Sequence, residues 1–188
     1  MTLDQSEIAA RIDRSAAVIS SLKSELVRIE RACASVRACL RGGRRLYSCG
    51  NGGSAAEAMH LTEELIGKYR SARAPYPAVC LNADPTALTC IANDYGYANV
   101  FARQVEALCS KGDVLVVFST SGVSENILLA LRAARARGTT TIGLLGKTGG
   151  PAAELCDVPL VVPAPETEHI QEAHQVILHL MLEAVERP

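Results

Sequence analysis

The sequence predicts an α/β fold: a three-layer α-β-α sandwich with a five-stranded parallel sheet and a long N-terminal helix. From residue 43 onward, five short apolar segments alternate with amphipathic ones, the order typical of parallel strands joined by crossover helices. The apolar run within Asp113–Phe118 is typical of a strand buried on both faces. At 188 residues the chain has the length of one domain. We expect residues 1–41 to form an oligomerisation helix and residues 42–188 the α/β core.

The first segment, Asp4–Leu40, is predicted to form one long helix. Asp4 and Glu7 match a capping box, and Gly42-Gly43 ends the helix. A heptad seam of apolar or small residues runs along it: Ile19, Leu22, Leu26, Ile29, Cys33, Val36 and Leu40. A single helix cannot bury such a seam on itself. We therefore expect it to pack along its own domain and along a neighbouring subunit, which predicts an oligomer.

The remaining elements follow from apolar runs and from the turn residues between them. The predicted strands are Arg45–Cys49, Pro77–Leu81, Asp113–Phe118, Thr140–Leu145 and Val158–Val162. One predicted helix follows the glycines after the first strand and reaches Tyr69, and the others are Thr86–Ala92, Val100–Ser110, Ser124–Arg137 and Glu166–Glu186. An irregular turn is expected at Asn93-Asp94-Tyr95-Gly96.

Composition excludes several functional classes. Nineteen basic and 20 acidic residues give a net charge of −1, which does not favour binding to nucleic acid or to an anionic membrane. Only 4% of the residues are aromatic, too few for a surface that stacks single-stranded bases. The sequence has no apolar span of membrane-crossing length, and its N-terminus does not resemble a signal peptide. We therefore expect a cytoplasmic protein.

The seven cysteines are expected to be buried, reduced thiols. Their number is odd and no C-x-x-C pair occurs, so neither a disulfide framework nor a thiolate zinc site is indicated.

Two glycine- and hydroxyl-rich loops are the strongest candidates for a ligand site. Gly50–Ser54 and Ser119–Ser124 each follow a predicted strand and open a helix. Ligands of open parallel sheets bind beyond the carboxyl ends of the strands, and amides at a helix N-terminus favour an anion. The second loop, Ser119–Ser124, is the better phosphate candidate because it offers four hydroxyls within six residues. The alternative interpretation is ordinary capping and turn chemistry.

Two nucleotide-binding motifs are only partly matched. Gly50–Ala55 fits G-x-G-x-x-A, but the second strand ends in Leu81-Asn82 without the acidic residue of a dinucleotide site. Gly146-Lys147-Thr148 resembles the end of a P-loop, but Thr141 stands where that motif needs glycine. A dinucleotide-dependent oxidoreductase thus remains a weak alternative, and a nucleotide triphosphatase is not favoured.

The helix after the first loop carries His60 and Glu64 one turn apart, a compact pair of metal ligands. A solvated surface pair is the alternative interpretation. Glu57 and Glu63 are expected to lie on other faces of this helix as ordinary charges.

The last helix carries Gln171, Glu172, His174, Gln175 and His179 among apolar residues. A histidine in such an apolar stripe is more often a hydrogen-bonded core residue than a ligand. Gln171 and His179 are two turns, roughly 12 Å, apart along the axis, so their spacing does not nominate them as a metal pair.

Taken together and in order, the motifs resemble the phosphoheptose isomerases (sedoheptulose-7-phosphate isomerases) of the sugar isomerase (SIS) domain superfamily. The segments that carry this resemblance are Gly50-Asn51-Gly52-Gly53-Ser54, Ala58-Met59-His60 with Glu63-Glu64-Leu65, Ala92–Gly96, Ser119-Thr120-Ser121-Gly122 with Ser124, Gly146-Lys147 with Gly149-Gly150, and Ile170-Gln171-Glu172 with His174 and His179.

The resemblance implies a single SIS domain over residues 1–188 with a flavodoxin-like topology. It also implies a cytoplasmic homotetramer with active sites between subunits, which isomerises sedoheptulose 7-phosphate to D-glycero-D-manno-heptose 7-phosphate, the first step toward activated heptose. One Zn²⁺ per subunit is implied, bound by His60, Glu64, Gln171 and His179. The implied substrate-binding residues are Asn51, Gly52, Gly53, Ser54, Asn93, Asp94, Ser119, Thr120, Ser121, Ser124 and Gln171.

An aldose–ketose isomerase moves a proton between C1 and C2 and shifts protons between O1 and O2. We assign the carbon proton to Glu64 and the oxygen protons to His179, as carboxylate base and imidazole acid. A carboxylate held on zinc is a poorer base, so either Glu64 leaves the ion during turnover or the metal is mainly positional.

Three positions depart from the family pattern. Val123 replaces a common Asn, Lys68 a common Arg near the phosphate, and Glu168 a common Asp. The main alternative function is that of a non-catalytic SIS relative that binds the bacterial replication initiator and has lost the metal ligands. The joint presence of His60, Glu64, Gln171 and His179 favours the isomerase.

Overall fold

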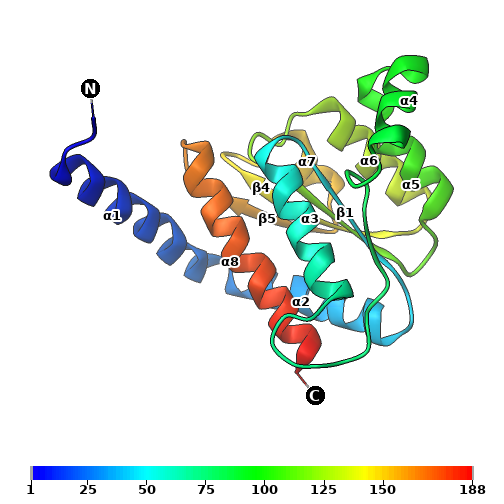
Figure 1. The fold of residues 1–188 in the computed structure, drawn as a ribbon, viewed down its shortest axis with the longest axis horizontal. Helices are drawn as coiled ribbons and strands as arrows, with labels where there is room; N and C mark the ends of the chain where they lie inside the picture. The colour runs from blue at the N-terminus through cyan, green and yellow to red at the C-terminus, as the bar shows by residue number, and fades with distance from the viewer. Residues whose placement is uncertain (1, 188) are drawn as a thin grey trace.

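The computed structural model describes residues 2–187 and confirms the predicted α/β fold (Figure 1). All strand pairs are parallel, in the order β2-β1-β3-β4-β5, which is the flavodoxin-like order. The strands are β1 (Leu46–Gly50), β2 (Ala78–Cys80), β3 (Val114–Ser119), β4 (Thr140–Gly146) and β5 (Val158–Val162).

Helices cover both faces of this sheet and give it two apolar cores (Figure 1). One face packs against α2 (Leu26–Arg41), α3 (Gly53–Ile66) and α8 (Thr167–Glu186). The other packs against α4 (Pro85–Tyr95), α5 (Ala102–Leu108), α6 (Glu125–Ala136) and α7 (Gly150–Leu155).

The central strand β3 is buried along its whole length, as its sequence predicts. Val114, Val116 and Phe118 enter the core beneath α3 and α8, whereas Leu115 and Val117 enter the opposite core. Because β1 and β3 are parallel neighbours, the loops that follow them lie side by side at the carboxyl end of the sheet.

The predicted N-terminal helix is present and contains one tighter turn. It consists of α1 (Gln5–Ser21), the 3₁₀ turn η1 (Leu22–Glu25) and α2, and the Asp4–Glu7 capping box is formed. Ile29 and Val36 of the seam are buried against the domain. None of the described α1 residues is buried, and α1 extends away from the sheet (Figure 1).

One local prediction is wrong, and one short element was missed. The irregular turn expected at residues 93–96 is instead the end of α4, which is capped by Asp84 and continues to Tyr95; Gly96, with φ of 81°, ends it. A second 3₁₀ turn, η2 (Tyr97–Asn99), follows. The short helix α7 was not predicted.

The cysteines follow the expectation in part. All seven are free and four are buried, but Cys33 and Cys156 are only half-buried and Cys90 is exposed. Burial raises the pKa of Cys109 and of Cys156 to about 12, so these thiols stay protonated at neutral pH. Among the helices described, none combines the length and hydrophobicity needed to cross a bilayer.

Candidate functional site

The loop that joins β1 to α3, residues 50–54, is called the glycine loop. A side chain at Gly50 would collide with the carbonyl oxygen of Ser54, so only glycine allows this close turn. Gly52 has φ of 57°, a conformation that glycine adopts without strain. The Asn82 side chain accepts from the Gly50 N–H at 3.1 Å and donates to its carbonyl at 2.9 Å, which fixes the loop to the end of β2.

The loop that joins β3 to α6, residues 119–124, is called the serine loop. The Ser119 hydroxyl accepts the Gly122 N–H at 3.1 Å and closes the turn. At Gly122, φ is +66° and a Cβ would collide with the carbonyl oxygen of Gly149. The Gly122 carbonyl accepts the Ala152 N–H at 3.1 Å. Gly149 and the first turn of α7 therefore pack against Gly122 and hold the serine loop in place.

A polar cavity of about 160 Å³ lies between the two loops and the start of α8. Several of the predicted substrate-binding residues line it: Asn51, Gly53, Ser54, Ser119, Thr120, Ser121, Ser124 and Gln171. Phe118 and Thr167 line it too and were not predicted. Its size and its hydroxyl and amide lining suit a small anionic group such as phosphate.

Asn51 links the two loops. Its side-chain amide exchanges two hydrogen bonds with that of Asn126, at 2.9 and 2.8 Å, and its oxygen also accepts the Tyr97 hydroxyl at 3.1 Å. Asn126 is 3% exposed and was not predicted. The signal in the sequence is an asparagine directly before the apolar residues of α6.

Gly52, Asn93 and Asp94 are predicted substrate residues that do not line this cavity. Asn93 and Asp94 are exposed in the last turn of α4, where the Asn93 amide donates to the Asp94 carboxylate at 2.7 Å. Tyr97, three residues after Asp94, reaches Asn51, so the end of α4 lies beside the glycine loop.

A second group of predicted residues meets farther along α3 and α8 and is called the histidine cluster: His60, Glu64 and His179. The His60 Nε2 atom lies 3.6 Å from Glu64 Oε1, and the rings of His60 and His179 meet edge to face at 5.2 Å. A ligand atom of Glu63 also lies within 4.8 Å of ligand atoms of His60 and Glu64. Glu63 is exposed, as expected, but it is not remote from the cluster.

The His179 ring is held by stacking on Tyr69, with centroids 5.7 Å apart and planes at 19°. Burial lowers the pKa of His179, electrostatic repulsion between the two imidazoles lowers it further, and Glu64 opposes the shift. A lowered pKa keeps the imidazole neutral at pH 7, the form that can bind a metal ion or exchange protons.

Gln171 lies at the cavity. Its amide packs over Gly53, where a Cβ would approach Gln171 Nε2 to 2.5 Å. The structure thus brings His60, Glu64 and His179 together. Gln171 lies about two turns before His179 on α8, beside the cavity and not in the histidine cluster.

Glu57 is a correction. It was expected to be an ordinary charge on a different face of α3 from His60 and Glu64, but it is 3% exposed and faces His174 of α8. Its Oε2 lies 3.8 Å from His174 Nδ1, and His174 Nε2 lies 3.2 Å from the Leu145 carbonyl. Both Glu57 oxygens and His174 Nδ1 are buried without a hydrogen-bond partner among the described residues. His174 is a core histidine, as expected.

The positions that depart from the family pattern lie outside the cavity. Lys68 is exposed beyond the end of α3, and the Val123 side chain is exposed on the serine loop. Glu168 pairs with Arg11 of α1 at 2.8 Å.

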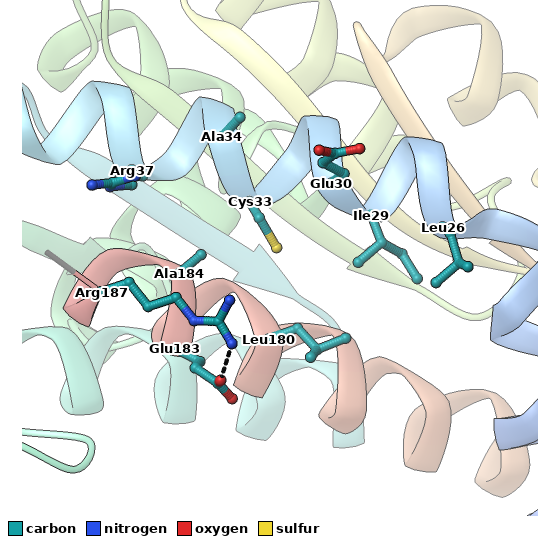
Figure 2. A pocket seen from close by; sticks show the side chains of 10 residues that line it. All are labelled: Leu26, Ile29, Glu30, Cys33, Ala34, Arg37, Leu180, Glu183, Ala184 and Arg187. Carbon is teal, nitrogen blue, oxygen red and sulfur yellow. Dashed lines mark hydrogen bonds and ion pairs between the residues drawn. The ribbon is translucent and has the colours of Figure 1, made fainter.

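A larger apolar groove of about 430 Å³ lies away from this chemistry, between α2 and α8 (Figure 2). Leu26, Ile29, Cys33 and Leu180 point into it, and Arg187 bonds Glu183 at its edge. Leu26 is 61% exposed although it belongs to the predicted seam.

Comparisons with known proteins agree with this architecture. Residues 12–146 match the model of the SIS domain. A phosphoheptose isomerase of Aliarcobacter butzleri is 46% identical over 180 residues, which cover 96% of this chain and 94% of that one. A phosphoheptose isomerase of Nitratiruptor is 50% identical over 147 residues, or 78% of this chain and 79% of the relative.

Solved structures agree as well. A phosphoheptose isomerase from Neisseria gonorrhoeae superposes with a TM-score of 0.91 at 39% identity, over 97% of this chain and 98% of that one. One from Francisella tularensis gives a TM-score of 0.94 at 31% identity, with both chains fully covered. The chain is a member of the SIS domain family and, within it, of the phosphoheptose isomerases.

Proposed function

We propose that the protein isomerises sedoheptulose 7-phosphate to D-glycero-D-manno-heptose 7-phosphate through an enediol, the first step toward activated heptose. One observation carries the proposal: α3 and α8 both run from a hydroxyl-lined cavity to a cluster of two imidazoles and a carboxylate. An anion site and an acid–base pair are the two parts that a sugar-phosphate isomerase needs.

The phosphate would lie in the cavity. Backbone amides at the start of α6 and hydroxyls of the serine loop are its expected donors, since Ser124 makes no capping hydrogen bond of its own. Asn93 and Asp94 would act in a site that two subunits share.

His60, Glu64 and His179 fit a Zn²⁺ ion because imidazole nitrogens and a carboxylate oxygen are common zinc ligands. Their separations support this, with 3.6 Å between His60 and Glu64 and 5.2 Å between the two rings. Gln171, about two turns before His179 on α8, would be the fourth zinc ligand. When bound, the ion would supply positive charge to stabilise the developing oxyanion.

Glu64 would take a proton from C1 of the ketose and return it to C2, while His179 would move protons between O1 and O2. His179 suits this task because it is held neutral and is fixed by the Tyr69 ring. The phosphate fixed in the cavity would keep the C1–C2 end in register with Glu64.

We also infer a homotetramer in the cytoplasm. The exposure of α1 supports self-association, since an isolated helix of its length is marginal in water. The apolar groove between α2 and α8 supports it too, because a second copy would cover Leu26 and Leu180 (Figure 2). The alternative, a non-catalytic SIS protein that binds a replication initiator, is not favoured because such a protein has no need for the histidine cluster.

The decisive test is to incubate the zinc-loaded and the chelated protein with sedoheptulose 7-phosphate and to follow the aldose by NMR. We expect the heptose 7-phosphate aldose to form only with the metal-loaded protein. A metal-loaded protein that leaves the ketose unchanged would contradict the proposal.

A further inference from the structure

We propose that Gln175 is a positioning residue for the metal site: its side-chain oxygen holds His60 in the tautomer and orientation that point Nε2 at the ion. The inference rests on the proposed function and adds to it a residue that the family resemblance does not assign. The observation behind it is a contact of 2.9 Å between His60 Nδ1 and Gln175 Oε1.

The chemistry of this contact fixes the proton on the ring. An amide oxygen can only accept, so Nδ1 must carry the hydrogen and donate it. In the neutral ring Nε2 then carries a lone pair, and it lies 3.6 Å from Glu64 Oε1, which is also an acceptor. Two acceptors that face each other repel unless a cation lies between them, so the Gln175 contact prepares His60 and Glu64 for a shared metal ion.

His60 needs this support because little else holds it. Its side chain is 32% exposed, and its other ring contacts are with His179 and Glu64, which are themselves proposed ligands. Gln175 lies on α8 one turn before His179, so a single helix orients both imidazoles. Partners of this kind commonly fix ligand tautomers in metal sites, and their loss costs about 10–100-fold in metal affinity.

The test uses two variants and measures zinc affinity by competition with a chromophoric chelator. Gln175→Leu removes the acceptor at similar volume and is expected to weaken zinc binding about 10–100-fold. Gln175→Glu keeps an oxygen toward Nδ1 and is expected to bind zinc at least as tightly as the natural protein.

A second readout does not depend on the metal. Long-range ¹H–¹⁵N spectra of the metal-free protein report the tautomer of each histidine, and His60→Gln identifies the His60 signals. We expect a single Nδ1–H tautomer in the natural protein and a mixture in Gln175→Leu.

Gln104→Leu is the matched control for the loss of an amide. Gln104 donates to the Leu81 and Val100 carbonyls, at 3.0 and 2.8 Å, on the opposite face of the sheet. We expect it to leave zinc affinity unchanged, and thermal melts of all variants confirm that they are folded.

The outcomes separate the two proposals. If the natural protein binds zinc but Gln175→Leu binds it equally well, or if Gln175→Glu fails to rescue, the positioning role is wrong and the isomerase proposal stands. If the natural protein binds no zinc, the metal site and the role of Gln175 are both wrong.

Discussion

The cavity at the strand ends and the histidine cluster lie along the same pair of helices, α3 and α8, but they are built in different ways. The cavity is made mainly by backbone amides and hydroxyls of two short loops, each continuous in the sequence, and Thr167 and Gln171 of α8 close it. The cluster is made by side chains that meet across helices more than a hundred residues apart along the chain. The geometry of the cavity is set mainly by short stretches of sequence. The geometry of the histidine cluster depends on how α3 and α8 pack against each other.

This difference predicts two kinds of kinetic defect. Changes in the loops should remove binding that is the same in the ground state and in the transition state, and should act on KM. Changes in the histidine cluster should remove interactions made only during proton transfer, and should act on kcat. Kinetic variants of each part test this division, and a stability variant tests how the two helices are held; they are taken from the largest expected effect to the smallest.

Glu64→Gln and His179→Ala should each lower kcat by about 10²–10⁴-fold, because each removes a proposed proton carrier. KM should change little, since the phosphate site is intact. Steady-state kinetics of zinc-loaded variants measures both constants, and metal content must be checked because both residues are also proposed ligands. Substantial kcat in either fully loaded variant would show that the residue is not the proton carrier.

Glu186 links the segment after α3 to the end of α8. Its carboxylate accepts the backbone N–H groups of Tyr69, Arg70 and Ser71, at 3.0 to 3.1 Å, and pairs with Arg73 at 3.2 Å. Burial acts to raise the pKa of Glu186, but these hydrogen bonds outweigh it, so the pKa is lowered.

Glu186→Gln should therefore cost about 2 kcal/mol of stability at neutral pH, the size expected for hydrogen bonds to a charged group. A lowered folded-state pKa means that this stability is present above the unfolded value, near 4.3, and is lost as the pH falls through the folded value. Urea unfolding at pH 7 and at pH 3 measures it. The difference between the variant and the natural protein should be smaller at pH 3 than at pH 7; an equal difference at both would contradict the role of the charge.

The fold was predictable because its signals are local. Buried parallel strands are apolar runs, and glycine marks the start or the end of several helices, among them α2, α3 and α4. The end of α4 was missed because Asn93 and Asp94 are typical turn residues, although Asp84 and Pro85 start a helix strong enough to continue through them. The helix α7 was missed because six residues are too few to show a period.

The site was predictable only in part, for a related reason. Helical spacing placed His60 and Glu64 on one face, but it could not tell how many faces of α3 are covered. Because the sheet and α8 both pack on α3, Glu57 is buried, where the sequence predicted a surface charge. Gln175 and Tyr69 were missed for the same reason, since their partners are distant in the sequence and only packing shows the contacts.

Ser124→Ala tests the loop half of the comparison. It removes one hydroxyl donor to the phosphate, and we expect KM to rise about 10-fold, which corresponds to about 1.4 kcal/mol, with kcat nearly unchanged. Ser110→Ala is the control and should leave KM unchanged, because Ser110 is exposed before the start of β3, at the opposite end of that strand from the serine loop. A fall in kcat without a rise in KM would place Ser124 in the chemical step and break the division between loops and cluster.

The smallest predicted effect concerns Glu125, the first residue of α6, which is exposed next to the serine loop. A carboxylate in the first turn stabilises the helix by about 0.3–1 kcal/mol through its interaction with the helix dipole. The same carboxylate repels a phosphate bound at the amides of that turn. Glu125→Gln should therefore lower KM about 2-fold, which improves substrate binding, and lower the melting temperature slightly, which reduces stability. The decrease in KM should disappear at high salt because an exposed charge is screened. Glu106→Gln, an exposed carboxylate on α5, should leave KM unchanged; equal effects of both variants would indicate long-range steering by net charge rather than local repulsion at the serine loop.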